Sequence, residues 1–287
     1  MKALACELPD KLGLPLSRFS RSELRRQVLE AGIVADISGV TIWRWLHEDA
    51  LRPWSRRSWI FPRDPDFATK AGHALDLYHR RWDGRALTAN EFVISADEKT
   101  QIPIRSTSQP ILPPAPGRSI RVESEYRRHG VCAYIAAWDV HRARLFGEVV
   151  GKISIVAFDA LVAQVMAMEP YRSAERVFWV VDNGTIHRGQ RAADRLQARF
   201  PNLTLVHLPK HASWLNQIEI YFSILQRKAL TPAHFTSQDE IAERILGFQD
   251  RYQQIASPFE WTFTRRDLDR LMARIPSSKP TSLPHAA

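Results

Sequence analysis

The sequence lacks several features that would fix its compartment or its chemistry. Only two of its 287 residues are cysteines, Cys6 and Cys132, and they have neither metal-ligand spacing nor the number needed for a disulfide framework. No apolar run approaches the roughly 20 residues needed to span a bilayer. Glu7, Pro9 and Asp10 interrupt any signal-peptide core at the front. A protein of the reducing cytoplasm, with no membrane partner, is therefore the default expectation.

Nucleotide-binding loops are missing as well. The sequence has no dinucleotide fingerprint, and "GEVVGKI" is one residue short of a phosphate loop, with Ile153 where that loop needs Ser or Thr. We therefore expect no nucleotide cofactor. Acidic residues are in the minority, with 31 Asp and Glu against 40 Lys and Arg, and the formal net charge is +9. This excess favours a polyanionic partner, and nucleic acid above all.

The front of the chain has the pattern of a helix-turn-helix DNA-binding unit. "SRSELRRQVLEAG" predicts a helix capped by Ser20, with Glu23 in a capping-box position. "VADISGVTIWRWLHED" predicts a tight turn and a second helix. Ser38, Thr41 and Arg44 come early on this second helix, and we expect them nearest the DNA bases. An ordinary helical hairpin is the alternative.

A basic stretch broken by prolines follows this unit. "LRPWSRRSWIFPRDPDF" interleaves two tryptophans with four arginines, which are Arg52, Arg56, Arg57 and Arg63. An extended segment of this composition can lie along a phosphate backbone. An amphipathic helix, roughly 67–82, leads from it into the rest of the chain.

From residue 91 onward the pattern changes to strands. Three strands with hairpin connections are expected first, beginning with "EFVISADEKTQIPI", and then helix, strand, helix, strand and helix. "RVFWVVDN" is nearly continuously apolar, as in a strand buried on both faces. The last helix is expected over 211–230. This order predicts an α/β sheet of mixed direction, with functional groups at the carboxyl ends of its strands.

Three acids stand where such a sheet would bring them together. Asp97 lies in the first strand, Asp182 ends the most buried strand, and Glu219 lies on the apolar side of the last helix. Each has an ordinary alternative: a solvated charge cluster at 97–99, turn chemistry at 182–184, and a helix-edge glutamate that reaches water. If the three converge, their mutual repulsion requires cations between them. Hard oxygen ligands favour Mg²⁺ or Mn²⁺, and two such ions suit displacement at phosphorus.

Three blocks of the sequence resemble the signature blocks of the DDE transposases. They are "ISADEKTQI", "FWVVDNGTIHRG" and "LPKHASWLNQIEIYF", and they most resemble the bacterial insertion-sequence branch of the mariner superfamily. The resemblance covers roughly residues 20–274 and implies an RNase H-like catalytic fold. It implies that Asp97, Asp182 and Glu219 are the catalytic residues and the ligands of Mg²⁺ or Mn²⁺. It also implies a bacterial, nucleoid-associated enzyme.

Four further residues are expected to support these acids: Asn183, His187, His211 and Asn216. His187 could contact phosphate or activate water, or it could simply cap the helix that it begins. Asn216 is expected to hold the turn that aims the third acid, and His211 to touch DNA. Glu98 should lie on the opposite face of its strand, with little part in the chemistry.

The resemblance also implies a function and a domain plan. The enzyme would cut at transposon terminal inverted repeats and join the freed 3′-OH ends to target DNA, as a homodimer on double-stranded DNA. A DNA-binding regulator with an inert catalytic domain and a ribonuclease H are the alternatives. We divide the chain into a helix-turn-helix domain (1–60), a basic linker and helix (61–90), a catalytic domain (91–274) and a disordered tail (275–287). Many family members carry two helix-turn-helix units, so we expect this front domain to be truncated.

The basic stretch generates a first prediction. Because its arginines would neutralise phosphates, DNA affinity should fall steeply with salt, and each phosphate contact should add about −0.9 to the slope of log affinity against log salt concentration. Fluorescence anisotropy with a duplex at several salt concentrations measures this slope. A flat response would mean that the stretch does not touch DNA.

Overall fold

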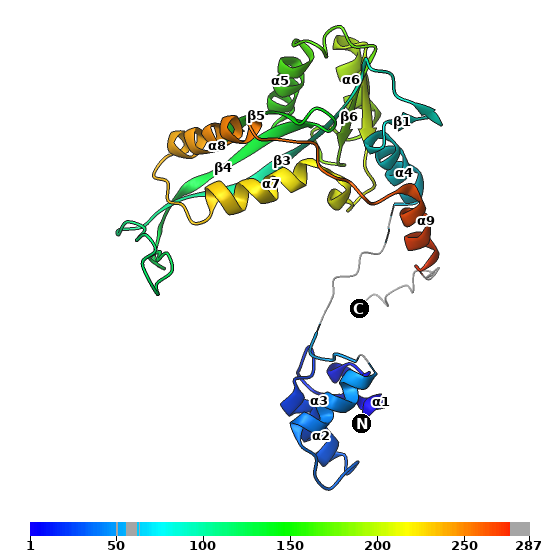
Figure 1. Cartoon of the computed structure of the whole chain (residues 1–287), viewed down its shortest axis with the longest axis vertical. Helices are drawn as coiled ribbons and strands as arrows, with labels where there is room; N and C mark the ends of the chain where they lie inside the picture. Colours follow the sequence, from blue (N-terminus) through cyan, green and yellow to red (C-terminus); the bar gives the residue numbers. More distant parts are fainter. Residues whose placement is uncertain (50, 56–61, 63, 276–287) are drawn as a thin grey trace, which may run out of the picture. The chain divides into compact units, whose positions relative to one another are not determined.

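The computed structural model describes residues 1–49, 51–55, 62 and 64–275. They fall into two compact units, Met1–Phe61 and Pro62–Ala287, which are described separately below (Figure 1). Arg52 is exposed. Arg56, Arg57 and Arg63 lie outside the described residues, as does the predicted tail beyond residue 275. Within the described ranges, no helix has both the length and the apolar character needed to cross a membrane.

The first unit contains the two predicted helices, α2 (Arg21–Glu30) and α3 (Gly39–Glu48). Ser20 caps α2 and Ser38 caps α3, each through a hydroxyl that accepts a backbone N–H three residues later. A short helix that the sequence did not reveal, α1 (Lys2–Ala5), packs beside them. One small core joins the three helices: Ala5, Phe19, Leu24, Val28, Ile37, Ile42 and Leu46.

The polar residues at the start of α3 are hydrogen-bonded to each other. The Ser38 hydroxyl accepts the Thr41 N–H at 3.0 Å, and the two hydroxyls are 2.9 Å apart. Further along α3, Arg44 is exposed. Trp43 is also exposed and stacks on His47, with 4.9 Å between ring centroids. The exposed side of α3 therefore combines an arginine with an aromatic pair.

The second unit is built on a five-stranded sheet in the order β5-β4-β3-β6-β7. Its strands are β3 (Glu91–Ser106), β4 (Arg127–Asp139), β5 (Arg144–Val150), β6 (Arg176–Val181) and β7 (Leu203–His207). The first three pair antiparallel, whereas β6 and β7 join parallel to β3 and to each other. The predicted sheet of mixed direction is therefore confirmed. The β3–β4 ladder shifts register between Lys99 and Ile102, where Gln101 has a φ of 55°.

Helices cover both faces of this sheet (Figure 1). They are α4 (Phe67–Tyr78), α5 (Ile155–Met166), α6 (Gly189–Arg199), α7 (Ile218–Leu225), α8 (Gln238–Gln253) and α9 (Arg265–Ala273), and a small ribbon of β1 (Arg81–Trp82) and β2 (Arg85–Ala86) follows α4. Alternate residues of β3 serve the two faces. Val93 belongs to the core shared with α4, α7, α8 and α9, and Ile94 to the core shared with α5 and α6. The sheet is thus buried on both sides.

The helix predicted over 211–230 begins later than expected. His211 has a left-handed φ of 60°, and Asn216 has extended backbone with a ψ of 112°. Neither conformation continues an α-helix. Ser213–Leu215 forms a single 3₁₀ turn between them, and α7 then starts with Glu219 in its first turn. The correction shortens the helix but leaves its acid at the end nearest the sheet.

Close packing of the sheet generates a second prediction. A Cβ on Gly147 would lie 2.5 Å from the hydroxyl of Tyr134, whose side chain is fully buried. Gly147→Ala should therefore destabilise the protein by about 1–3 kcal/mol, as other overpacked cores are destabilised. Urea unfolding followed by tryptophan fluorescence measures the change.

Gly247→Ala is the matched control. It lies inside α8, and apart from that helix's own backbone nothing lies within 4 Å of the added Cβ, so it should stabilise the protein by about 0.5–1 kcal/mol. Equal unfolding midpoints for Gly147→Ala and the parent would contradict the packing argument.

Candidate active site

The first two predicted acids come from neighbouring parallel strands. The register pairs Ser95 of β3 with Val180 of β6, so two residues further along each strand bring Asp97 and Asp182 level. Asp97 is 6% exposed, inside the sheet. Asp182 directly follows the end of β6, and its side chain is 36% exposed. The sheet therefore brings one buried and one accessible carboxylate side by side.

A group of buried hydrogen bonds attaches α7 to this point of the sheet. The Ser95 hydroxyl accepts the Ile218 N–H at 3.0 Å and donates to the Asn216 side-chain oxygen. The Asn216 amide in turn donates to Asp97 Oδ2 at 3.0 Å. Glu219 follows immediately and is half-buried. One asparagine thus orients the first acid and fixes the turn that delivers the third.

Two further contacts hold the surrounding loops. The hydroxyl of Tyr78, at the end of α4, donates to the Leu215 carbonyl at 2.8 Å. The Asn183 side chain donates to the Leu208 carbonyl, which ties the loop after β6 to the loop after β7. Both segments that flank the acids are therefore fixed by side chains from other elements.

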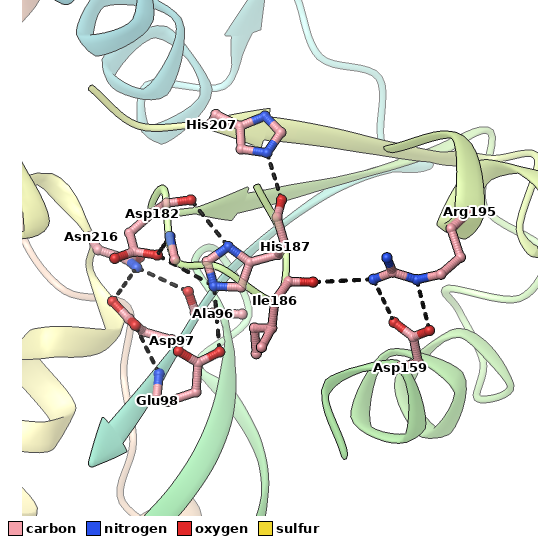
Figure 2. Close-up of polar contacts among 11 residues, drawn as sticks. Ala96, Asp97, Glu98, Asp159, Asp182, Ile186, His187, Arg195, His207 and Asn216 are labelled. Atoms are coloured by element: carbon pink, nitrogen blue, oxygen red, sulfur yellow. Dashed lines mark hydrogen bonds and ion pairs between the residues drawn. The ribbon is translucent and has the colours of Figure 1, made fainter. Parts of the chain in front are cut away.

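His187 lies between two acids in the loop that follows β6 (Figure 2). Its Nε2 is 3.3 Å from Asp182 Oδ1 and 3.4 Å from Glu98 Oε1. Its Nδ1 is 3.1 Å from the Asp182 carbonyl, to which it donates. The ring is fully buried. His207 donates to the His187 carbonyl at 2.7 Å, which fixes the backbone at the same place.

The contact of Glu98 with His187 was missed in the sequence. Glu98 does point to the opposite face of β3 from Asp97, as predicted, but the loop after β6 crosses that face and places His187 against it. This contact was not foreseen, and the small part of Glu98 in the chemistry stays a prediction. The available signal was the histidine in "DNGTIH", five residues after Asp182, which had no assigned partner.

Burial, together with neighbouring negative charge, raises the pKa of two of the acids. Burial, and then the charge of Asp182, raise the pKa of Asp97 to about 7, and Glu98 and Glu219 add to the effect. Burial also raises the pKa of Glu219, while Lys99 opposes the shift. For His187, burial lowers the pKa, but Glu98 and the two aspartates outweigh it and raise the pKa above its usual value.

The acids fit a divalent cation by donor chemistry but do not yet surround one. Within the described ranges, no three Asp, Glu, His or Cys side chains form a ready-made metal-binding group. Asp97 instead accepts the Glu98 N–H at 2.8 Å, and Asp182 accepts the Gly184 N–H at 2.6 Å. The closed cage of three carboxylates expected from the sequence is therefore absent here. Crowded, hard oxygen donors nevertheless match Mg²⁺ or Mn²⁺.

A surface hollow of about 470 Å³ opens beside the second acid. Its lining includes Asp182, Asn183, Arg188, Lys210 and His211. His211 is exposed there, while the Lys210 backbone N–H donates to the buried Asp64 at 3.0 Å. The hollow thus combines positive side chains with the accessible carboxylate of the pair.

One family profile and several solved structures match this chain. The profile described as DDE superfamily endonuclease matches residues 93–242, more than half of the chain, and this range includes all three acids. The fold is similar to that of the Mos1 mariner transposase in its paired-end complex with Mn (14% identity), its paired-end complex with the left transposon end (14%) and its paired-end complex with Mg (16%). Each match has a TM-score of 0.50 and covers 91% of this chain and 78% of that chain. No curated protein sequence matches this chain.

The raised pKa of Asp97 generates a third prediction. Its carboxyl keeps a proton more tightly when folded than when unfolded, so its contribution to stability is lost as pH rises from about 4 to about 7. Asp97→Asn should remove this loss, which is worth about 2–4 kcal/mol. Urea unfolding at about pH 4 and pH 8, with EDTA present, measures it.

The exposed carboxylate of Glu148 on β5 provides the control. Glu148→Gln should lose as much stability between the two pH values as the parent does. If Asp97→Asn also follows the parent, Asp97 does not carry the proton that the crowded site implies.

Proposed function

The chain belongs to the DDE superfamily of endonucleases, and we propose that it is a metal-dependent DNA transposase that cuts at transposon ends and joins the freed 3′-OH ends to target DNA. The observation that carries the proposal is the register of β3 and β6, which sets Asp97 and Asp182 level, with α7 attached beside them to deliver Glu219. No covalent intermediate with the protein is required.

Asp97, Asp182 and Glu219 are the proposed ligands of the metal. When bound, two Mg²⁺ or Mn²⁺ ions would supply positive charge to activate an attacking oxygen and to stabilise a leaving one. The protein must release the proton of Asp97 when a cation binds, because a carboxylate binds metal in its ionised form. Asn216 keeps one oxygen of Asp97 oriented by hydrogen bonding.

The hollow beside Asp182 is the proposed entry for the DNA strand that is cut. Arg188, Lys210 and His211 line it and would contact phosphates next to the scissile one. In this position the accessible acid, Asp182, is closest to the DNA strand, and the buried Asp97 lies behind Asp182. The arrangement favours a long polyanion over a small substrate.

The first unit is proposed to recognise the transposon ends. Its α3 would enter a major groove with Arg44 reading a base, near Ser38 and Thr41, whose mutual hydrogen bonds fix the start of the helix. Arg52, Arg56 and Arg57 would follow the phosphate backbone. The Mos1 mariner structures are named as paired-end complexes, and we propose that two copies of this chain likewise act on paired terminal inverted repeats, in the bacterial nucleoid.

Replacement of the three acids generates a fourth prediction. Asp97→Asn, Asp182→Asn and Glu219→Gln each keep side-chain shape but remove one negative charge from the metal ligands. Each should reduce nicking of an end-containing duplex by about 100-fold or more, since even indirect partners of metal ligands matter 10–100-fold. DNA affinity should stay unchanged, because the first unit is untouched.

Glu148→Gln is the control variant, since Glu148 is exposed on β5, which two strands separate from β6. A gel assay with Mg²⁺ or Mn²⁺ measures nicking, and a binding assay runs in parallel. Binding without nicking by the parent chain would favour an inert regulator, and preferred cleavage of an RNA–DNA hybrid would favour a ribonuclease H. If all three variants nick as the parent does, the assigned metal site is wrong.

A further inference from the structure

Two buried polar atoms near the site face each other but form no hydrogen bond within the described ranges. Glu98 Oε1 and His187 Nε2 are 3.4 Å apart. Each is inaccessible to solvent, and within the described ranges neither forms a hydrogen bond. A buried charged or polar group without a partner is costly, so a pair of this kind is retained only where the surrounding structure holds it. None of the three acids needs Glu98 as a neighbour in order to bind a cation.

The His187 ring touches the second acid at two points. Nδ1 donates to the Asp182 carbonyl at 3.1 Å, and Nε2 is 3.3 Å from Asp182 Oδ1. The same carboxylate oxygen accepts the Gly184 N–H at 2.6 Å. The ring therefore meets both the backbone and the side chain of one residue, as Figure 2 shows. Asp182 has little freedom to rotate while the ring stays in place.

The ring itself is fixed from several sides. It packs against Phe158 of α5, with 5.1 Å between ring centroids. A Cβ on Gly184 would lie 3.0 Å from its Cε1, so any side chain there would push against the ring. His207 holds its backbone carbonyl at 2.7 Å. Glu98 contacts the remaining corner, at Nε2.

We propose that Glu98 and His187 form a positioning pair that sets the orientation of the Asp182 carboxylate for metal binding. The inference rests on the proposed function. His187 is fully buried, so it does not meet a phosphate, and Glu98 lies on the opposite face of β3 from Asp97, so it acts through the ring and not as a ligand. Removing either partner frees the Asp182 side chain and weakens cation binding.

The same loop has a second support that serves as a matched control. Arg195 of α6 donates to the Ile186 carbonyl at 3.3 Å and pairs with Asp159 of α5 at 2.9 and 3.0 Å. This support acts only on the backbone and does not touch Asp182. Asp159→Asn therefore weakens the loop in general, whereas Glu98→Ala removes the specific contact with the ring.

The experiment measures Mn²⁺ affinity of the full chain without DNA, by electron paramagnetic resonance of free Mn²⁺. Glu98→Ala and His187→Gln should each weaken Mn²⁺ binding about 10–100-fold, as changes behind metal ligands do. Glu98→Gln, which keeps the side-chain shape and a polar atom against Nε2, should restore most of the affinity lost in Glu98→Ala. Asp159→Asn should stay close to the parent. Urea unfolding identifies any variant that fails to fold. If His187→Gln fails to fold, the test rests on Glu98→Ala.

The double variant Glu98→Ala with His187→Gln decides whether the two act together. A coupled pair predicts no further loss beyond the larger single effect, whereas independent roles predict that the losses multiply. Two results would overturn the proposed pair and leave the proposed function intact. One is that the losses multiply in the double variant. The other is that Glu98→Ala binds Mn²⁺ as the parent does while Asp182→Asn does not. If Asp182→Asn neither loses Mn²⁺ nor stops nicking, the proposed function itself fails.

Discussion

Repulsion among crowded carboxylates is the constraint on which this site depends. Four acids gather where the carboxyl end of β6 meets the middle of β3, and Lys99 opposes the raised pKa of one of them, Glu219. Folding without a cation therefore works against electrostatics, and the rest of the second unit must hold the acids in place. The sheet core on both faces, with its large buried aromatic side chains, supplies that support. The stability of this core thus offsets the repulsion among the acids at the site.

The support is provided largely by neutral hydrogen bonds. Ser95 and Asn216 attach α7 to β3 through bonds that neither add charge nor depend on pH. Asn216 orients Asp97 with its amide, where a lysine or arginine would have neutralised the acid and competed with a metal. A neutral framework around charged ligands keeps the negative charge available. It also means that the third acid reaches the site only when α7 is docked on the sheet.

How far the sequence leads is clearest from particular residues. Asp97 and Asp182 could be placed together because strand periodicity and crossover topology are local patterns with few outcomes. Asn216 stood in a recognisable block. The later start of α7 could not be read, because it depends on the backbone of His211 and on bonds between Asn216 and a strand about 120 residues earlier. The contact between Glu98 and His187 depends on the conformation of a loop, which hydrophobic periodicity does not predict. Helix α1 is too short to show a periodic pattern.

The shift in the β3–β4 ladder has a consequence for how the family can vary. Three residues beyond Glu98, the ladder admits extra backbone at Gln101, and pairing resumes at Ile102. A strand normally transmits any insertion to every side chain after it, because one added residue exchanges the two faces. Here the irregular pairing at Gln101 lets the register change without exchanging the faces on which the acids lie. A residue added to β3 beyond residue 102 would therefore leave Asp97 and Glu98 on their opposite faces.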